Sequence, residues 1–152
     1  MLLPKLNFPE YSFRLRKTST GKHQIFDRVR KKFVDLSPEE WVRQHLIVFL
    51  SEEHSFPLSA FLVEKGLKLN NTFKRTDIVI YAKTGKALVL IECKEPGVQL
   101  DEKVVQQSLR YNLTHNAPYV LISNGLQHFS IQITEGQKGR ILTCFPNYHD
   151  IQ

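Results

Sequence analysis

The sequence of 152 residues is poor in cysteine and has no long apolar run. Cys93 and Cys144 lie far apart and form no CxxC pair, so neither a disulfide framework nor a cysteine-based zinc site is indicated. The six histidines are scattered without the spacing of zinc ligands. No segment approaches the length of a membrane span, and Pro4 and Lys5 interrupt the short apolar start that a signal peptide would need. We therefore expect a cytoplasmic protein with two reduced, buried thiols and no membrane contact.

Most of the chain also lacks an excess of either charge. Residues 37–152 hold twelve basic and twelve acidic side chains, whereas residues 1–36 hold nine basic and three acidic ones. The net charge of +6 therefore lies entirely in the N-terminal segment. A basic segment attracts the phosphate backbone of a nucleic acid without reading its sequence. A solvated, solubilising surface explains the charge alone equally well.

The basic segment has the pattern of a β-hairpin. Residues 11–16 alternate apolar with polar side chains, and residues 23–26 follow after a polar turn. We expect residues 1–36 to form an arm with this hairpin, packed on a single domain of residues 37–152. The basic side chains expected to contact phosphates are Arg14, Arg16, Lys31 and Lys32.

A buried strand is predicted at residues 88–94, where an apolar run follows Gly85. The run ends in Glu92 and Lys94, which share one face of the strand, while Cys93 points to the other face. A carboxylate and an ammonium group at the end of a buried strand are costly unless the protein uses them.

The preceding strand, residues 76–81, supplies a second carboxylate. A hairpin loop of two or four residues before residue 87 pairs positions that add to the same number along the ladder, and Asp77 then lies opposite Glu92. The two β-carbons would be about 5 Å apart. Two facing carboxylates repel each other unless a cation lies between them, and carboxylate oxygens suit Mg²⁺ or Mn²⁺. The pair therefore predicts a metal site with Lys94 beside it.

These residues resemble a known family. Thr76-Asp77 followed by Glu92-Cys93-Lys94 is similar to the PD-(D/E)xK nuclease signature. A wider set of segments resembles the N-terminal nuclease domain of type I restriction enzyme R subunits, over about residues 37–126. The matching segments are residues 37–44, 75–77, 91–94 and 110–112. The resemblance implies an α/β fold, a restriction-endonuclease-like sandwich with a mixed central sheet flanked by helices.

The resemblance also implies a set of metal ligands. Asp77 and Glu92 would bind Mg²⁺ or Mn²⁺, and the carbonyl of Cys93 would complete the shell. In the family an acidic residue of the first helix also helps to hold the metal. Residues 37–50 predict that helix, with Ser37 as N-cap and Pro38 at the first helical position. Glu39 is the expected ligand and Glu40 the alternative; both could instead only favour the helix N-terminus electrostatically.

Further positions carry roles that the resemblance implies. Lys94 would orient or deprotonate the attacking water, or stabilise negative charge on the phosphate. A helix predicted from Glu102 to about Leu113, capped by Asp101, carries a Gln-x-x-x-Tyr pair that would support the active site. That pair is Gln107 and Tyr111. Arg75 could contact a phosphate.

The expected function is that of a Mg²⁺-dependent endonuclease acting on DNA. The alternative is a non-catalytic nucleic-acid-binding module that keeps the nuclease fold. Nothing in the sequence supplies the ATP-binding loop of a restriction motor, so we expect either a stand-alone nuclease or one that acts beside separate motor or restriction subunits. A homodimer and the target sequence stay open.

Overall fold

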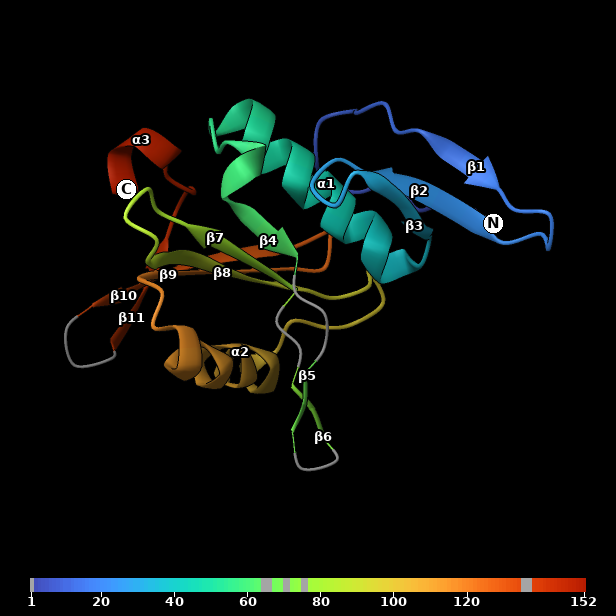
Figure 1. The fold of residues 1–152 in the computed structure, drawn as a ribbon. Coiled ribbons are helices and arrows are strands. Elements are labelled where there is room, and N and C mark those ends of the chain that lie inside the picture. Colours follow the sequence, from blue (N-terminus) through green and yellow to red (C-terminus); the bar gives the residue numbers. More distant parts are fainter. Residues whose placement is uncertain (1, 64–66, 70–71, 75–76, 135–137) are drawn as a thin grey trace.

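The structure, a computed structural model, describes residues 2–63, 67–69, 72–74, 77–134 and 138–152. A six-stranded sheet lies at its centre (Figure 1). Its strands, in chain order, are β4 (Phe61–Val63), β7 (Ile78–Tyr81), β8 (Ala87–Cys93), β9 (Tyr119–Ser123), β10 (His128–Thr134) and β11 (Lys138–Leu142). In space their order is β11-β10-β9-β8-β7-β4, with β8 and β9 parallel and every other neighbouring pair antiparallel. The expected mixed central sheet is confirmed.

Helices cover both faces of this sheet (Figure 1). Helix α1 (Pro38–Glu53) and the short α3 (Tyr148–Ile151) lie on one face, and α2 (Glu102–His115) lies on the other. Helix α2 connects β8 to β9, as a parallel pair requires a crossover. A 3₁₀ turn, η1 (Leu58–Ala60), leads into β4.

Strand β8 is buried on both faces, which explains its continuous apolar sequence. Val89, Ile91 and Cys93 belong to the core cluster that includes residues of α1. Leu90 belongs to a second cluster, packed against residues of α2. The polar end of β8 therefore emerges between two hydrophobic layers.

Both long helices begin at the predicted caps. The Ser37 hydroxyl accepts a hydrogen bond from the Glu40 N–H at 3.0 Å, and Pro38 occupies the first turn of α1. The Asp101 carboxylate accepts from the Val104 N–H at 3.0 Å at the start of α2. Because the cap defines the start of α1, it places Glu39 and Glu40 in the first turn of the helix.

The N-terminal segment is a three-stranded sheet rather than the predicted hairpin. Its strands are β1 (Leu15–Lys17), β2 (His23–Asp27) and β3 (Lys32–Asp35), in the order β1-β2-β3. A second turn, not expected from the sequence, returns the chain from β2 to β3. The Asp27 carboxylate accepts from the N–H groups of Val29 and Arg30, and Lys31 takes a left-handed φ of 54°. The side chain of Asp27 thus organises a turn that was not predicted, because the basic stretch of residues 28–32 carries no glycine or proline.

Strand β4 ends at Val63, which pairs with Ile78 of its partner β7. Further along, the chain forms a separate two-stranded ribbon of β5 (Leu67–Leu69) and β6 (Thr72–Lys74). In Figure 1 this ribbon projects away from the central sheet.

Two further expectations concern the thiols and the membrane. Cys93 is buried and Cys144 is exposed, so the prediction of two buried thiols is wrong for Cys144. Cys144 follows the last strand of the sheet, beyond the core. Across the described ranges, no helix combines the length and the apolar character needed to cross a bilayer.

Candidate functional site

The pairing of β7 with β8 has the predicted register near its open end. Ile78 lies opposite Ile91 and Ile80 opposite Val89, which extends to place Asp77 beside Glu92. The turn differs from both predicted loops. Ala82 donates its N–H to the Lys86 carbonyl at 2.9 Å, which leaves a three-residue loop. The resulting one-residue offset is cancelled by a bulge between Ile80 and Tyr81, so the predicted register holds.

Asp77 is buried, with 3% of its surface exposed, and both of its carboxylate oxygens are bonded. Oδ2 accepts the Cys93 N–H at 2.7 Å, and Oδ1 accepts from the Arg43 guanidinium of α1. The sequence predicts that only a bound cation relieves the charge of Asp77 opposite Glu92. The structure corrects this expectation, because a side chain of the protein itself supplies a positive charge.

Glu92 is also buried, at 5% exposure, but only one of its oxygens is satisfied. Oε1 lies 3.2 Å from the Lys94 Nζ, whereas Oε2 has no hydrogen-bond partner in the described part of the chain. Burial and the charge of Asp77 raise the pKa of Glu92 to about 8, against the opposing effect of Lys94. The unpartnered oxygen is an acceptor that a proton or a cation could satisfy.

Lys94 lies on the same face of the strand as Glu92, as predicted, and is partly accessible. Its side chain is 27% exposed, compared with 7% for that of Glu92. Burial alone would lower the pKa of Lys94, but the Glu92 and Asp77 carboxylates reverse that effect and raise it. Lys94 therefore presents a positive charge toward solvent from the end of β8.

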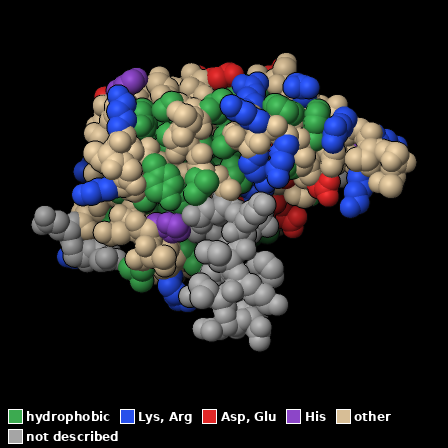
Figure 2. Space-filling model, in the orientation of Figure 1, with side chains coloured by type: hydrophobic (Ala, Val, Ile, Leu, Met, Phe, Trp, Pro, Cys, Tyr) green, Lys and Arg blue, Asp and Glu red, His purple; other side chains and the backbone are tan. Residues whose placement is uncertain are grey.

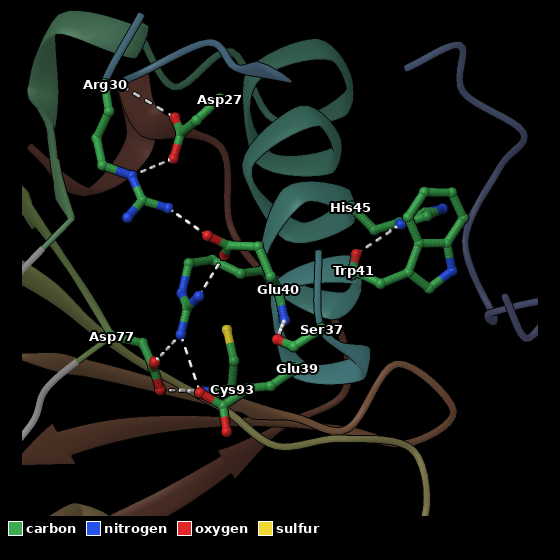
Figure 3. A network of polar contacts seen from close by, with 10 residues as sticks. Asp27, Arg30, Ser37, Glu39, Glu40, Trp41, His45, Asp77 and Cys93 are labelled. Carbon is green, nitrogen blue, oxygen red and sulfur yellow. Dashed lines mark hydrogen bonds and ion pairs between the residues drawn. The ribbon is translucent and has the colours of Figure 1, made fainter. Parts of the chain in front are cut away.

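A chain of alternating charges runs from this site to the N-terminal sheet (Figure 3). Arg43 binds Asp77 and Glu40, Glu40 also binds Arg30, and Arg30 binds Asp27. The Asp27 and Glu40 side chains are 0% and 6% exposed, so these contacts are shielded from water. Burial opposes the charge of Arg43, yet the neighbouring acids raise its pKa, and the Cys93 thiol stays neutral because burial raises its own pKa.

Among the described residues, the network joins five carboxylates to three cations. The carboxylates are Asp27, Glu39, Glu40, Asp77 and Glu92, and the cations are Arg30, Arg43 and Lys94. Each of the three cations contacts at least one buried acid.

The donor set fits a hard cation only in part. Asp77 and Glu92 offer oxygen ligands, and the open Glu92 Oε2 is suited to a metal. No three Asp, Glu, His or Cys side chains of the described residues lie close enough together to hold a metal ion. A cation held by these two carboxylates would need backbone or water oxygens as well, as Mg²⁺ commonly retains water.

The two acids of the first helix have different surroundings. The Glu40 side chain is 6% exposed and is held by two arginines. The Glu39 side chain is 36% exposed and accepts from Arg43 Nη2 at 3.0 Å. Glu39 thus lies next to the site through Arg43, and Glu40 serves to anchor that arginine.

Gln107 and Tyr111 form the expected pair on α2. The Gln107 Nε2 donates to the Tyr111 hydroxyl at 3.1 Å. Among the described contacts, neither side chain bonds to Glu92 or Lys94. The two side chains therefore contact each other. They lie on α2, the helix that covers the face of the sheet on which Glu92 lies.

The basic candidates lie on the N-terminal sheet. The Arg14 guanidinium lies 4.5 Å from the Phe26 ring centre, and that of Arg16 lies 4.0 Å from the Phe33 ring centre. Lys31 and Lys32 are exposed. Figure 2 shows Lys and Arg side chains gathered over this part of the molecule. Arg75 lies outside the described residues.

Arg43 was not among the site residues predicted from the sequence. A signal was present, because Arg43 follows Val42 directly and precedes Leu46 by three positions on a helix whose apolar stripe includes both. A charged residue at the border of a buried stripe requires a partner of opposite charge. The partner on β7 is 34 positions away in sequence, and no local pattern identifies it.

Comparison with known proteins identifies the family. Residues 38–146, well over half of the chain, match the family described as the N terminus of type I restriction enzyme R proteins. No curated protein matches the sequence. A solved fragment of a putative HsdR subunit of a type I restriction enzyme from Vibrio vulnificus YJ016 has a similar fold, with a TM-score of 0.57 and 13% identity. The similarity covers 76% of this chain and 24% of the Vibrio chain, so this chain spans about a quarter of that protein's length. The chain belongs to the family of type I restriction enzyme R protein N-terminal domains.

Proposed function

We propose that the chain is a Mg²⁺-dependent endonuclease of the PD-(D/E)xK type that hydrolyses phosphodiester bonds in DNA. One observation carries the proposal: the buried Glu92 has an unpartnered carboxylate oxygen beside Asp77, with the Lys94 ammonium 3.2 Å from its other oxygen. A buried carboxylate oxygen without a hydrogen-bond partner is destabilising, so its presence calls for a ligand. The family is that of a restriction-enzyme subunit, which supports DNA as the substrate that would lie beside this ligand.

Asp77 and Glu92 are the side chains that would hold Mg²⁺ or Mn²⁺, together with the Cys93 carbonyl. A divalent cation there supplies Lewis-acid activation of water and of a phosphate oxygen. The Cys93 N–H and Arg43 fix the carboxylate of Asp77. Glu39 is partly exposed and shares the Arg43 Nη2 donor with Asp77, and it would assist through a water molecule.

Lys94 is suited to stabilise charge on the phosphate. Its ammonium group is paired with Glu92 and remains partly accessible to a substrate. A lysine whose pKa is raised keeps its proton, which favours electrostatic stabilisation over proton abstraction. Gln107 and Tyr111 would contact DNA from α2.

The direct test is cleavage of supercoiled plasmid by the purified chain with Mg²⁺, with EDTA as the metal-free control. We expect nicking by the parent and none by Glu92→Gln, which removes the ligand charge and keeps the shape. Glu95→Gln is the matched control, since Glu95 is an exposed acid three positions further along the chain. Equal nicking by parent and Glu92→Gln would contradict the proposal.

A second candidate function is a non-catalytic DNA-binding module. The contact of Arg43 with Asp77 favours it, because a guanidinium already satisfies one oxygen of the expected metal ligand. The same plasmid experiment separates the two functions. Binding of DNA that is insensitive to EDTA, with no nicking under any divalent cation, would support the module.

A further inference from the structure

We infer that Arg43 is a positioning residue, which holds the Asp77 carboxylate in the orientation required for metal binding. The inference rests on the proposed role of Asp77 as a ligand. It assigns to α1 a second contribution to the site, besides the acid that the resemblance implies.

The geometry of Asp77 is the first step. Its Oδ2 is fixed by a backbone donor, the Cys93 N–H at 2.7 Å. Its Oδ1 is fixed by a side-chain donor, the Arg43 Nη2. Two donors on opposite oxygens fix the plane of a carboxylate. Because a ligand must be oriented before the metal arrives, donors of this kind typically change metal affinity when they are removed.

The shape of the guanidinium is the second step. Arg43 contacts Glu40 through Nη1, and both Asp77 and Glu39 through Nη2, so one rigid fork spans two buried acids and a partly exposed one. The side chain is 3% exposed, and its Nε has no partner among the described residues. A lysine would carry the same charge on a single flexible nitrogen and would not fix both acids in one plane.

Arg43 is in turn held in place from outside the site. Arg30 donates to the other oxygen of Glu40, and it also donates to Asp27 in the turn that links β2 to β3. These contacts hold the guanidinium of Arg43 through Glu40, while Asp77 is its partner on the strand side. Among these charged contacts, the orientation of Asp77 depends directly on Arg43 and only indirectly on Arg30.

The test is calorimetric titration of the whole chain with Mn²⁺ in the absence of DNA. Arg43→Lys keeps the charge of the cluster, so a change in affinity reports orientation rather than electrostatics. We expect Arg43→Lys to weaken Mn²⁺ binding by about 10- to 100-fold. Arg30→Lys is the matched control, because Arg30 contacts Glu40 but not Asp77, and we expect its affinity to stay within about twofold of the parent.

A second variant covers the case in which Arg43→Lys does not fold. Glu40→Asp also keeps the charge and shortens the anchor of Arg43, and it should weaken Mn²⁺ binding in the same direction. Thermal melting in EDTA shows which variants are folded. Unchanged Mn²⁺ affinity in the folded variants, or an equal loss in Arg30→Lys, would overturn the inference alone. If the parent binds no Mn²⁺, the metal site itself is wrong and the inference falls with it.

Discussion

Two pairs of arginines in this chain have opposite surroundings. Arg30 and Arg43 lie between carboxylates, and their side chains are 25% and 3% exposed. Arg14 and Arg16 are exposed and lie over the rings of Phe26 and Phe33 on the N-terminal sheet. No salt bridge within the described ranges involves either exposed arginine.

The difference shows how one residue type serves two purposes. A buried guanidinium is stable only when acids satisfy it, so its donors are committed to the fold. A guanidinium that rests on an aromatic ring is held in place by the ring face and keeps donors for a ligand. Although Arg16 gives one donor to Gln24 at 2.8 Å, its remaining donors face solvent. Net charge alone does not distinguish these two pairs.

Removing Arg43 should have the largest effect on stability. Arg43→Met keeps the volume but leaves Asp77 and Glu40 without their shared partner, which should lower the free energy of unfolding by about 3–5 kcal/mol. Arg14→Met, at an exposed position, should change it by no more than about 0.5 kcal/mol. Urea denaturation followed by circular dichroism measures both values.

The comparison would fail if the two substitutions had similar effects. Equal small losses would show that the buried ion pairs add little to stability, as the desolvation cost of such pairs permits. A large loss in Arg14→Met would show that its packing on Phe26 supports the N-terminal sheet. The double variant tests independence, since distant sites should be additive within about 0.5 kcal/mol.

The sequence was sufficient for the features that depend on local pattern. The caps of α1 and α2 and the buried β8 follow from residue types at fixed spacing, whereas the mixed sheet was expected from the family resemblance. The placement of Asp77 beside Glu92 was also predicted, but for an incomplete reason. The real turn has three residues, and a bulge that no sequence pattern announces restores the register.

The sequence was insufficient where side chains meet across the fold. The contact of Arg43 with Asp77 joins a helix to a strand, and helix packing on a sheet decides it. The third strand of the N-terminal sheet was missed because the Asp27 carboxylate, rather than glycine or proline, organises the turn before it. Both omissions involve a buried acid, and a count of charged residues does not reveal which acids are buried.

The pH dependence of stability should report Glu92. The folded chain keeps a proton on Glu92 up to about pH 8, whereas the unfolded chain releases it near the ordinary value of 4.5. Between these values the folded state binds more protons, so stability should fall as pH rises, by up to about 1.4 kcal/mol per pH unit.

The variant Glu92→Gln isolates this contribution. It has no titration at this position, so the difference in unfolding free energy between variant and parent should grow in the variant's favour from pH 5 to pH 8, measured in EDTA. Burial lowers the pKa of His45, His54 and His128, but their effects are common to both proteins and cancel. A difference that is independent of pH would show that Glu92 is ionised throughout.

The smallest effect on stability, and a clear one on DNA binding, is expected for the exposed arginines. Arg14→Gln with Arg16→Gln removes two charges from the N-terminal sheet, and unfolding should change by no more than about 0.5 kcal/mol per site. If both arginines contact phosphates, the slope of log affinity against log salt should become shallower by roughly 1.8.

The control is Lys83→Gln with Lys86→Gln. It removes two exposed charges at the turn where β8 begins, whereas Glu92 lies near the other end of that strand. Binding to a short duplex in EDTA, measured at several salt concentrations, gives both slopes. The control should keep the parent slope, because a phosphate contact depends on position whereas net charge does not. If both double variants shift the slope equally, the N-terminal sheet contributes only net charge, and the comparison between the two pairs of arginines would hold for stability alone.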